Sequence, residues 1–312
     1  MAKSIHRLSL VIAALQEVAP GVRAFTLTDP EDWPLPPFTA GAHIDLHLPS
    51  GRIRQFSLCN DPADGNRYVV TVQGEAHGRG GSLEMLALGP GTELLASLPR
   101  NTFPLAEDAG RHVMVAGGIG LTPFLSMIPV LERASADWHL HACARAAEAV
   151  PDGGRLVQVA TERVTQHLSD SGSRLDLPAL IAGLGPHDHL YVCGPERMIV
   201  QALEAGTGLG ERLHVERFGT TVTGATAAYE LELARSGQRI AVAAGQGMLD
   251  ALRAAGVEVP SSCEGGVCLE CKTRYLSGTP LHRDLLMSEI DRQSYVTPCV
   301  SGCSGGRLML DL

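Results

Sequence analysis

The sequence lacks a long hydrophobic run, since no stretch approaches the ~20 apolar residues that a membrane-spanning helix needs. Aromatic residues are also scarce, at 4% of the chain, which is few for a surface that stacks the bases of single-stranded nucleic acid. Nor is there an excess of positive charge, because 25 lysines and arginines stand against 34 aspartates and glutamates, for a net charge of −9. These absences argue against nucleic acid or an anionic membrane as the main partner.

The chain has 312 residues, enough for two or three domains with cores of their own. Its N-terminal stretch "KSIHRLSLVIAAL" combines positive charge with an apolar run, as a signal peptide does. We expect a first β-strand instead, because Leu8, Leu10 and Ile12 alternate on one face and a turn follows directly. The protein is therefore predicted to be cytoplasmic, where structural disulfides are rare.

Residues 1–107 are predicted to form an antiparallel β-barrel or sandwich. Short alternating runs are broken by Gly, Pro, Asn and Asp, with no long helical stretch between them. The clearest runs are "VRAFTLT", "HIDLHL", "RQFSLC", "YVVTVQ" and "TELLASL".

Residues 108–218 change to an alternation of strands and helices, which predicts a doubly wound parallel α/β sheet of the nucleotide-binding type. "TPFLSMIPVLER" and "PERMIVQALEA" have helical periodicity and carry a proline near the first turn. One irregularity is "AAEAVPDGG", which predicts that the second crossover helix is short or shifted.

Residues 219–228 are small, polar and uncharged, and are predicted to be a linker. Residues 229–312 form the third segment. It opens with a hairpin candidate, "YELELARSGQRIAVAAG", and an amphipathic helix, "QGMLDALRAAGV". A loop rich in cysteine follows, and then short elements.

That loop, "SSCEGGVCLECK" at 261–272, holds three of the eight cysteines of the chain. The spacing is Cys263-x4-Cys268-x2-Cys271 with Cys299 further on, which matches the spacing of plant-type [2Fe–2S] ferredoxins. Three thiolates from one loop must converge on a small cluster, and the two intervening glycines permit unusual backbone angles and leave amides free for the sulfides. The spacing predicts an iron–sulfur site.

Zinc is an alternative, but it usually takes two separated short pairs. Here only Cys268 and Cys271 form a C-x2-C pair, because three residues separate Cys299 from Cys303. A thioredoxin-like redox pair would stand at a helix start in a βαβ unit. Cys303 is interpreted as a packing residue, and its use as fourth ligand in place of Cys299 is left open.

"PSSCEGGVCLECKTRYLSG", followed by "TPCVSGC", resembles the C-terminal ferredoxin domain of the phthalate dioxygenase reductase family, which includes vanillate O-demethylase reductases. The resemblance extends over essentially the whole chain. It implies a flavin-binding barrel, an NAD-binding α/β domain and a β-grasp ferredoxin domain. Leu269 and Glu270 depart from the small residues that many plant-type ferredoxins have between the second and third ligands, and they are candidates for partner recognition.

"RQFSLCN" resembles the R-x-Y-S flavin motif of the family. By this resemblance Arg54 contacts the phosphate region of the flavin, Phe56 packs near the ring, and Ser57 bonds the ring edge. Phe56 replaces the common tyrosine, so a hydroxyl contact is lost. Thr71 and Val72 are candidate neighbours of the ring.

"GRGGS" at 78–82 resembles the phosphate clamp of the FMN-binding members, and FMN is therefore favoured over FAD. Backbone amides at a helix start form an anion site, to which a serine and an arginine can add a donor and a positive charge. The implied phosphate contacts are Arg79, Gly80, Gly81 and Ser82.

"VAGGIGLTPF" resembles the dinucleotide loop of the family, although it is not a strict G-x-G-x-x-G. Gly117, Gly118 and Gly120 would let a pyrophosphate approach the backbone at a helix N-terminus. The resemblance places Thr122 between flavin and nicotinamide.

"YVCGPERM" and "HVERFG" complete the implied site. In the family the C-G-P motif, here Cys193, Gly194 and Pro195, stands beside the nicotinamide where hydride passes to the flavin. Glu216 and Phe218 would approach the flavin ring, although Phe218 could equally be a core residue.

Arg145 follows the second strand of the α/β segment, where an acidic residue would select NADH and an arginine could bind a 2′-phosphate. The resembled family mostly uses NADH despite this arginine, so NADH is favoured over NADPH. The implied catalytic residues are Cys193, Thr122 and Ser57.

The order of the modules predicts an NADH-dependent oxidoreductase. NADH delivers two electrons as hydride, the cluster accepts one at a time, and a flavin between them can do both. By resemblance, the acceptor is the Rieske-type oxygenase component of a separate protein. A haem monooxygenase as acceptor, and a non-redox nucleotide-binding module with a zinc-stabilised tail, are the alternatives.

Overall fold

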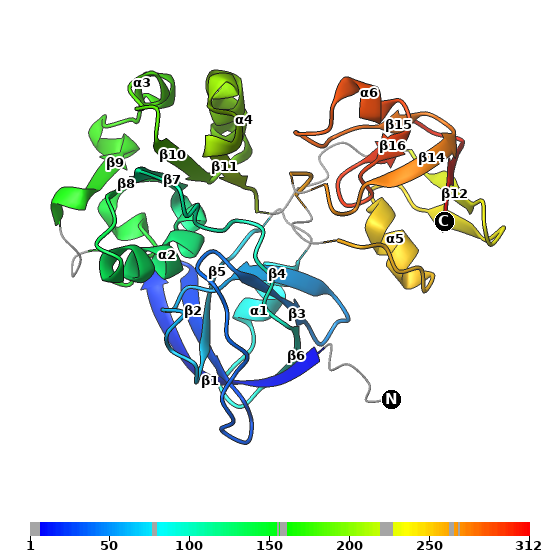
Figure 1. Ribbon diagram of the computed structural model, residues 1–312. Helices are drawn as coiled ribbons and strands as arrows, with labels where there is room; N and C mark the ends of the chain where they lie inside the picture. The colour runs from blue at the N-terminus through cyan, green and yellow to red at the C-terminus, as the bar shows by residue number, and fades with distance from the viewer. Residues whose placement is uncertain are drawn as a thin grey trace. The chain divides into compact units, whose positions relative to one another are not determined.

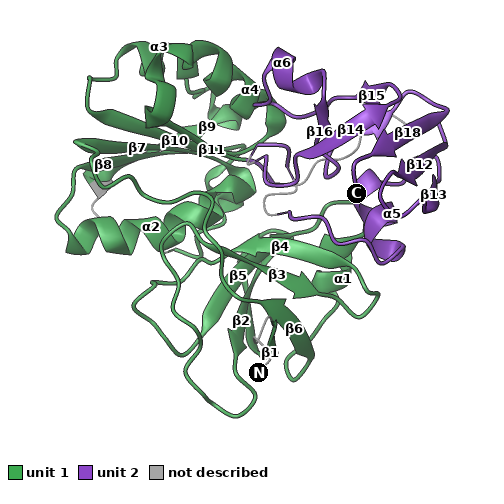
Figure 2. Cartoon of the chain, turned by 45° about the vertical axis from the view of Figure 1, so that its right-hand side comes forward, with its two compact units in different colours: residues 1–216 green, residues 217–312 purple. Residues whose placement is uncertain are grey.

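The computed structural model describes residues 7–76, 80–154, 156, 161–218, 227–261, 265–267 and 269–312. It divides into two compact units, residues 1–216 and 217–312, which Figure 2 colours green and purple. Among the described residues, no helix has the length and apolar character to cross a membrane. Three predicted site residues, Arg79, Cys263 and Cys268, lie outside the described residues, as do residues 219–226 of the predicted linker.

Unit 1 begins with an antiparallel sheet of order β4-β3-β6-β1-β2-β5. A bridge between Leu58 and Val70 joins the chain just after β4 to β5, so the two edges of the sheet meet and the sheet closes as a barrel. A short helix, α1 (Gly81–Leu86), lies against β4 and β5. The strands are β1 (Arg7–Ala19), β2 (Val22–Thr28), β3 (His43–His47), β4 (Ile53–Ser57), β5 (Tyr68–Gln73) and β6 (Glu93–Ser97).

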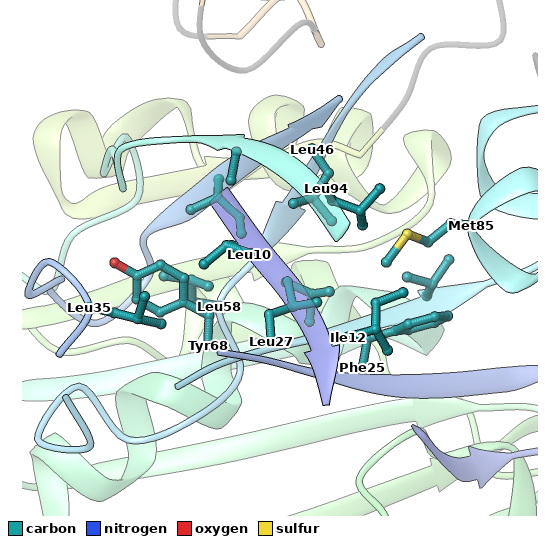
Figure 3. Close-up of a cluster of buried hydrophobic side chains, with 14 of the residues drawn as sticks. Leu10, Ile12, Phe25, Leu27, Leu35, Leu46, Leu58, Tyr68, Met85 and Leu94 are labelled. Carbon is teal, nitrogen blue, oxygen red and sulfur yellow. The ribbon is translucent and has the colours of Figure 1, made fainter. Parts of the chain in front are cut away.

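The barrel interior is filled by alternate side chains from its strands (Figure 3). Leu10 and Ile12 of β1 and Phe25 and Leu27 of β2 are fully buried, as the period of two in a half-buried strand requires. The predicted first strand is confirmed, but it is longer than expected. Register shifts after Ile12 and after Glu17 carry β1 on to Ala19, because bulges let a strand bend without ending.

The second layer of unit 1 is a parallel sheet of order β11-β10-β7-β8-β9. Figure 1 shows α2 on one side of this sheet and α3 and α4 on the other, which is the doubly wound arrangement. The strands are β7 (Arg111–Gly117), β8 (Trp138–Ala144), β9 (Val164–Leu168), β10 (Asp188–Cys193) and β11 (Leu213–Glu216), and the helices are α2 (Thr122–Arg133), α3 (Leu177–Ala182) and α4 (Glu196–Ala205).

The connection between β8 and β9 begins with a single short 3-10 turn, η2 (Ala147–Ala149), in agreement with the predicted irregularity there. Other 3-10 turns are η1 (Gly118–Leu121), which joins β7 to α2, η4 (Thr161–Arg163), η5 (Ser169–Ser171) and η6 (Thr207–Arg212).

Unit 2 has a mixed sheet of order β13-β12-β18-β14-β16 with α5 packed against it. The first two strands form the predicted hairpin, and the last long strand, β18, runs parallel to β12 in the β-grasp manner. A further pair, β15 with β17, is antiparallel. The elements are β12 (Tyr229–Leu233), β13 (Arg239–Val242), α5 (Met248–Ala254), β14 (Thr273–Ser277), β15 (Pro280–Leu281), α6 (Glu289–Arg292), β16 (Tyr295–Val296), β17 (Gly302–Cys303) and β18 (Arg307–Leu310).

Candidate functional site

The predicted flavin motif forms β4, and its arginine reaches the start of α1. A Cβ atom added at Gly81 would lie 2.2 Å from Nε of Arg54, so a larger residue there would displace this arginine side chain. Gly80, before the helix, has a φ of 78°, a left-handed conformation that glycine adopts without strain. The structure therefore brings Arg54 close to the described part of the glycine turn. In the sequence, 24 positions separate residue 54 of the first motif from residue 79 of the second.

The donors at this point suit a phosphate. The guanidinium of Arg54 carries a permanent positive charge, and it lies at the start of α1, where backbone amides favour an anion. The hydroxyl oxygen of Ser82 accepts a hydrogen bond of 3.0 Å from the backbone N–H of Glu75, which leaves the hydroxyl proton to be donated. These groups fit the phosphate of FMN.

Thr71 and Val72 are adjacent on β5 and therefore point to opposite faces. Val72 belongs to the barrel core. Thr71 is 5% exposed, and among the described residues its hydroxyl oxygen has no hydrogen-bond partner. Because a buried hydroxyl without a partner is costly, Thr71 is the better candidate to contact a bound ligand through its side chain. Phe56 is half-buried and packs against the edge of the barrel core.

The predicted dinucleotide loop connects β7 to α2 through η1. A Cβ atom at Gly120 would lie 2.1 Å from the backbone oxygen of Cys193, and one at Gly117 would lie 2.5 Å from Cδ of Pro195. Gly118 differs, since it has a φ of 55° and open space around it. Two of the glycines are thus required where this loop meets the loop after β10, and the third shapes a backbone that a pyrophosphate can approach.

Thr122 begins α2 and is 2% exposed. Its hydroxyl donates a hydrogen bond of 3.0 Å to the carbonyl of Ile119, which fixes the turn between the glycine loop and the helix. The first residues of α2 are buried, so the helix start is held within the unit.

Ser57, Cys193 and Glu216 come together from three strands of unit 1. In the parallel pairing of β10 with β11, Cys193 stands opposite Glu216. The hydroxyl of Ser57 donates a hydrogen bond of 3.4 Å to Oε2 of Glu216, across 159 positions of sequence. The exposed fractions are 4% for Ser57, 0% for Cys193 and 6% for Glu216.

The electrostatics of these three residues follow from burial. Desolvation raises the pKa of Glu216 to about 8, although the hydrogen bond from Ser57 opposes the shift. Desolvation, together with the nearby carboxyl of Glu216, raises the pKa of Cys193 well above its usual value. At neutral pH the carboxyl group is mostly protonated and the thiol is neutral, so Cys193 is not a thiolate nucleophile here.

Two further predicted contacts lie apart from this group. Arg145 directly follows β8 and is exposed, and its carbonyl accepts a hydrogen bond of 3.0 Å from the backbone N–H of Asp170. Phe218 is half-buried and belongs to unit 2.

In unit 2, Cys271 and Cys299 are the two described members of the predicted ligand set. Their sulfur atoms lie 3.2 Å apart, and the side chains are 4% and 6% exposed. A disulfide bond would bring the sulfurs to ~2.05 Å, so these two sulfur atoms are not bonded to each other. Cys303 instead donates from its thiol to the carbonyl of Gly305 at 3.2 Å. The geometry thus favours Cys299 over Cys303 as the fourth ligand.

The described part of the cysteine loop has a constrained backbone. Gly266 has a φ of 72°, and a Cβ atom there would lie 2.8 Å from Cγ2 of Val300. Leu269 also adopts a left-handed conformation, with a φ of 58°, which costs a non-glycine residue ~1–2 kcal/mol. The carbonyl of Leu269 accepts a hydrogen bond of 2.9 Å from the N–H of Lys272. Residues 269–272 therefore form a tight turn that contains Cys271.

Sequence reasoning missed Arg217, which lies between two residues that it did select. Arg217 is 5% exposed, and its guanidinium donates a hydrogen bond of 3.3 Å to the carbonyl of Gly265 in the cysteine loop. From a single sequence, a charged residue in the middle of a motif is expected to be exposed to solvent. Only the burial of Arg217 in the structure shows that it supports the cysteine loop.

Comparisons with known proteins agree with this arrangement. The model of the 2Fe–2S iron–sulfur cluster binding domain matches residues 231–303. The chain is 40% identical to the heme-dependent oxidative N-demethylase beta subunit of Ectopseudomonas mendocina, covering 98% of this chain and 99% of that one. It is 36% identical to phthalate dioxygenase reductase of Burkholderia cepacia, over 98% and 97% of the two chains.

Among solved structures, a phthalate dioxygenase reductase superposes with a TM-score of 0.86 at 35% identity, over 98% of each chain. That structure is described as modular, for electron transfer from pyridine nucleotides to [2Fe–2S]. The barrel, the parallel nucleotide-binding sheet and the ferredoxin domain therefore define an iron–sulfur flavoprotein reductase, and the predicted fold class is confirmed. More narrowly, the chain belongs to the phthalate dioxygenase reductase family.

The predicted activity is confirmed with the family. The chain is an NADH-dependent oxidoreductase, the reductase component of an oxygenase system, and its cofactors are FMN and a [2Fe–2S] cluster.

Proposed function

We propose that this reductase component passes its electrons to a Rieske-type oxygenase component, with the nicotinamide and flavin rings meeting beside Ser57, Cys193 and Glu216. The observation that carries the placement of the rings is the hydrogen bond between Ser57 and Glu216, which joins the barrel to the parallel sheet where Cys193 also lies. The similarity to phthalate dioxygenase reductase supports the acceptor. A hydride can pass only between rings held in contact, and such contact needs groups from both layers at one point.

The residues of the chain divide the work as follows. Arg54 and the glycine turn before α1 hold the phosphate of FMN, while the hydroxyl of Thr71 offers a hydrogen bond to the flavin. Bound FMN supplies the chemistry of taking a hydride from NADH and releasing electrons one at a time. The carboxyl group of Glu216, beside Ser57, is mostly protonated at neutral pH. The thiol of Cys193 is also neutral, so neither of these two buried side chains is charged.

In unit 2, Cys271 and Cys299 hold the cluster together with Cys263 and Cys268. The 3.2 Å separation of the two described sulfur atoms supports this ligand set. NADH approaches the loops after β7 and β10, at Gly117, Gly118, Gly120, Gly194 and Pro195. Arg145, at the end of β8, lies toward the adenosine half of NADH.

We make two further proposals, one on the domain bounds and one on the location of the protein. The domains are a flavin-binding barrel at 1–107, an NAD-binding domain at 108–218, a linker at 219–228 and a ferredoxin domain at 229–312; the strand positions of the three main sheets support these bounds. The location is cytoplasmic, which the similarity to phthalate dioxygenase reductase supports.

The acceptor can be tested by mixing the NADH-reduced holoprotein with a purified Rieske oxygenase component and following cluster reoxidation by stopped-flow absorbance. Reoxidation should saturate with oxygenase concentration, and one electron should appear on the Rieske centre for each one lost by the cluster. Reoxidation no faster than that by dissolved oxygen alone would rule out this acceptor.

A haem monooxygenase is the second candidate acceptor. It is favoured by the 40% identity to the beta subunit of a heme-dependent oxidative N-demethylase. The same stopped-flow experiment with a purified haem monooxygenase as acceptor separates the two, because haem reduction has its own absorbance change.

A further inference from the structure

The most exposed large hydrophobic side chain of the described chain lies in the ferredoxin unit. Ile290, in α6, is 80% exposed, and Leu286, just before this helix, is 44% exposed. In Figures 1 and 2, α6 lies at the end of unit 2 that is away from α5. Single exposed apolar residues are common on protein surfaces, so the exposure alone does not indicate a function. The surroundings of these two residues do.

The segment that carries them is joined to the cysteine loop at two points. The backbone N–H of Leu285 donates a hydrogen bond of 3.0 Å to the carbonyl of Gly266. The ammonium of Lys272, next to Cys271, forms an ion pair of 2.9 Å with Asp291 of α6. Leu286 and Ile290 therefore lie at the surface next to the loop that carries Cys271.

The segment is also held in one conformation. Asp284, whose side chain is fully buried, accepts hydrogen bonds from Arg292 at 3.0 Å and from the backbone N–H of Met287 at 3.1 Å. Ser288 caps α6 by accepting a hydrogen bond of 3.1 Å from the N–H of Asp291. A surface that is already ordered loses little conformational freedom when a partner covers it.

The charged residues around the two apolar residues are of both signs, and the two exposed ones that form no ion pair among the described residues are acidic. Lys272 and Arg292 are each paired with an aspartate within the segment, at 2.9 Å and 3.0 Å. Glu270 in the cysteine loop and Glu289 in α6 are exposed and form no ion pair within the described part of the chain. We call Leu286, Ile290, Glu270 and Glu289 the α6 patch. Its complement is an apolar depression flanked by lysine or arginine.

We propose that the α6 patch is the docking surface for the oxygenase component, which presents such a basic-rimmed apolar depression. In this contact one electron leaves the reduced [2Fe–2S] cluster and one metal centre of the oxygenase gains it, with no bond made or broken. The proposal rests on the proposed function, because it requires a separate protein as acceptor. The acceptor must approach the cysteine loop, and the patch adjoins that loop in the described structure.

The test uses full-length holoprotein and the purified Rieske oxygenase component. Three steps are followed by stopped-flow: flavin reduction by NADH, cluster reduction by the flavin, and cluster reoxidation at increasing oxygenase concentrations. Ile290→Ser should weaken the apparent affinity for the oxygenase about tenfold, since a buried apolar anchor of an interface commonly has an effect of this size. The first two steps should keep their wild-type rates.

Glu289→Lys tests the charge. It should lower the second-order rate of cluster reoxidation several-fold at low salt and flatten its dependence on ionic strength. Leu95→Ser, on β6 of unit 1, is the matched apolar control because Leu95 is 45% exposed. Glu258→Lys, after α5, is the control for charge reversal at an exposed position of the same unit. Both controls should behave as wild type.

Each other outcome has a definite meaning. Equal oxygenase affinity in wild type and Ile290→Ser would overturn the docking proposal while leaving the electron transfer itself intact. Slower cluster reduction by the flavin in Ile290→Ser would also overturn it, because the patch would then contact residues 1–216 of the chain itself. A wild-type protein that reduces neither a Rieske oxygenase component nor a haem monooxygenase would overturn the proposed function, and the docking proposal with it.

Discussion

The proposed flavin–nicotinamide site in unit 1 and the proposed cluster site in unit 2 are built in different ways. In unit 1, the hydrogen-bonded pair Ser57 and Glu216 comes from strands 159 positions apart. In unit 2, three of the four predicted ligands lie within nine positions of one loop, and Cys299 follows 28 positions after Cys271. The cluster site is specified by local spacing, whereas the redox site exists only once two layers have packed together.

This difference predicts what a substitution does in each unit. A change in the cysteine loop should remove one cofactor and leave the other unit folded and active. A change at the contact of the two layers should disturb stability and hydride transfer together, because the same atoms serve both.

The largest expected effect is at the cluster. Cys299→Ser should abolish the visible absorbance of the [2Fe–2S] cluster, while NADH still reduces the flavin at its wild-type rate, since the two sites lie in separate compact units. The visible spectrum and a stopped-flow trace of the flavin band measure the two properties.

Cys303→Ser is the matched control for this substitution. Because the thiol of Cys303 donates a hydrogen bond to the carbonyl of Gly305 and forms none with a cysteine among the described residues, the variant should keep its cluster. A cluster lost in Cys303→Ser and kept in Cys299→Ser would reverse the ligand assignment.

The second effect is at the contact between the two nucleotide loops. In Gly120→Ala the new methyl group would meet the backbone oxygen of Cys193 at 2.1 Å, and a backbone atom in a buried strand cannot move aside. We expect unit 1 to lose ~1–3 kcal/mol of stability, as overpacked interiors do, and hydride transfer to slow strongly. Urea unfolding and stopped-flow flavin reduction measure these, with Gly89→Ala, which has open space, as control. Wild-type hydride transfer in Gly120→Ala would contradict the role of this contact.

The third effect depends on pH. Because the pKa of Glu216 is about 8 in the folded protein against an ordinary 4.5, the folded state holds a proton between these values that the unfolded state has released. The free energy of unfolding of flavin-free protein should therefore fall as pH rises from about 4.5 to about 8. In Glu216→Gln this part of the slope should disappear.

Both tryptophans of the chain, Trp33 and Trp138, lie in unit 1, so tryptophan fluorescence in urea follows the relevant unit alone. Glu211→Gln, at an exposed position, is the control and should keep the wild-type slope. The same slope in Glu216→Gln and wild type would mean that Glu216 is ionised in the folded protein.

The smallest effect separates the two neighbours on β5. Thr71→Val removes a buried hydroxyl that has no partner among the described residues, so flavin-free protein should be as stable as wild type or slightly more stable. FMN should nevertheless dissociate several-fold more readily, which equilibrium dialysis can measure. An unchanged FMN affinity would separate Thr71 from the flavin site.

Much of the fold could be predicted because period-two and period-3.6 patterns are local. β2, β5 and α2 have the bounds of the segments "VRAFTLT", "YVVTVQ" and "TPFLSMIPVLER". The bulges that lengthen β1 could not be predicted, because they depend on its pairing with β2 and not on any local turn signal.

The parts of the candidate site that depend on spacing within a short stretch of sequence were the easiest to predict. The spacing of the cysteines carries its own physical meaning, so the iron–sulfur interpretation needs no other part of the chain. The sequence could not distinguish Thr71 from Val72, because it does not say which face of β5 is turned to the core. Nor could it single out Arg217, whose support of the loop at Gly265 depends on tertiary burial.

The close approach of Gly120 to Cys193 also has a consequence for protein engineering. Since a backbone atom of one loop occupies the space that a side chain of the other would need, the loops after β7 and β10 form a single interlocked part. Variant libraries that introduce side chains at Gly117 or Gly120 alone will therefore consist largely of sterically excluded members. Arg145, exposed at the end of β8, lies outside that interlock, so we expect substitutions there to alter coenzyme preference without disturbing the two loops.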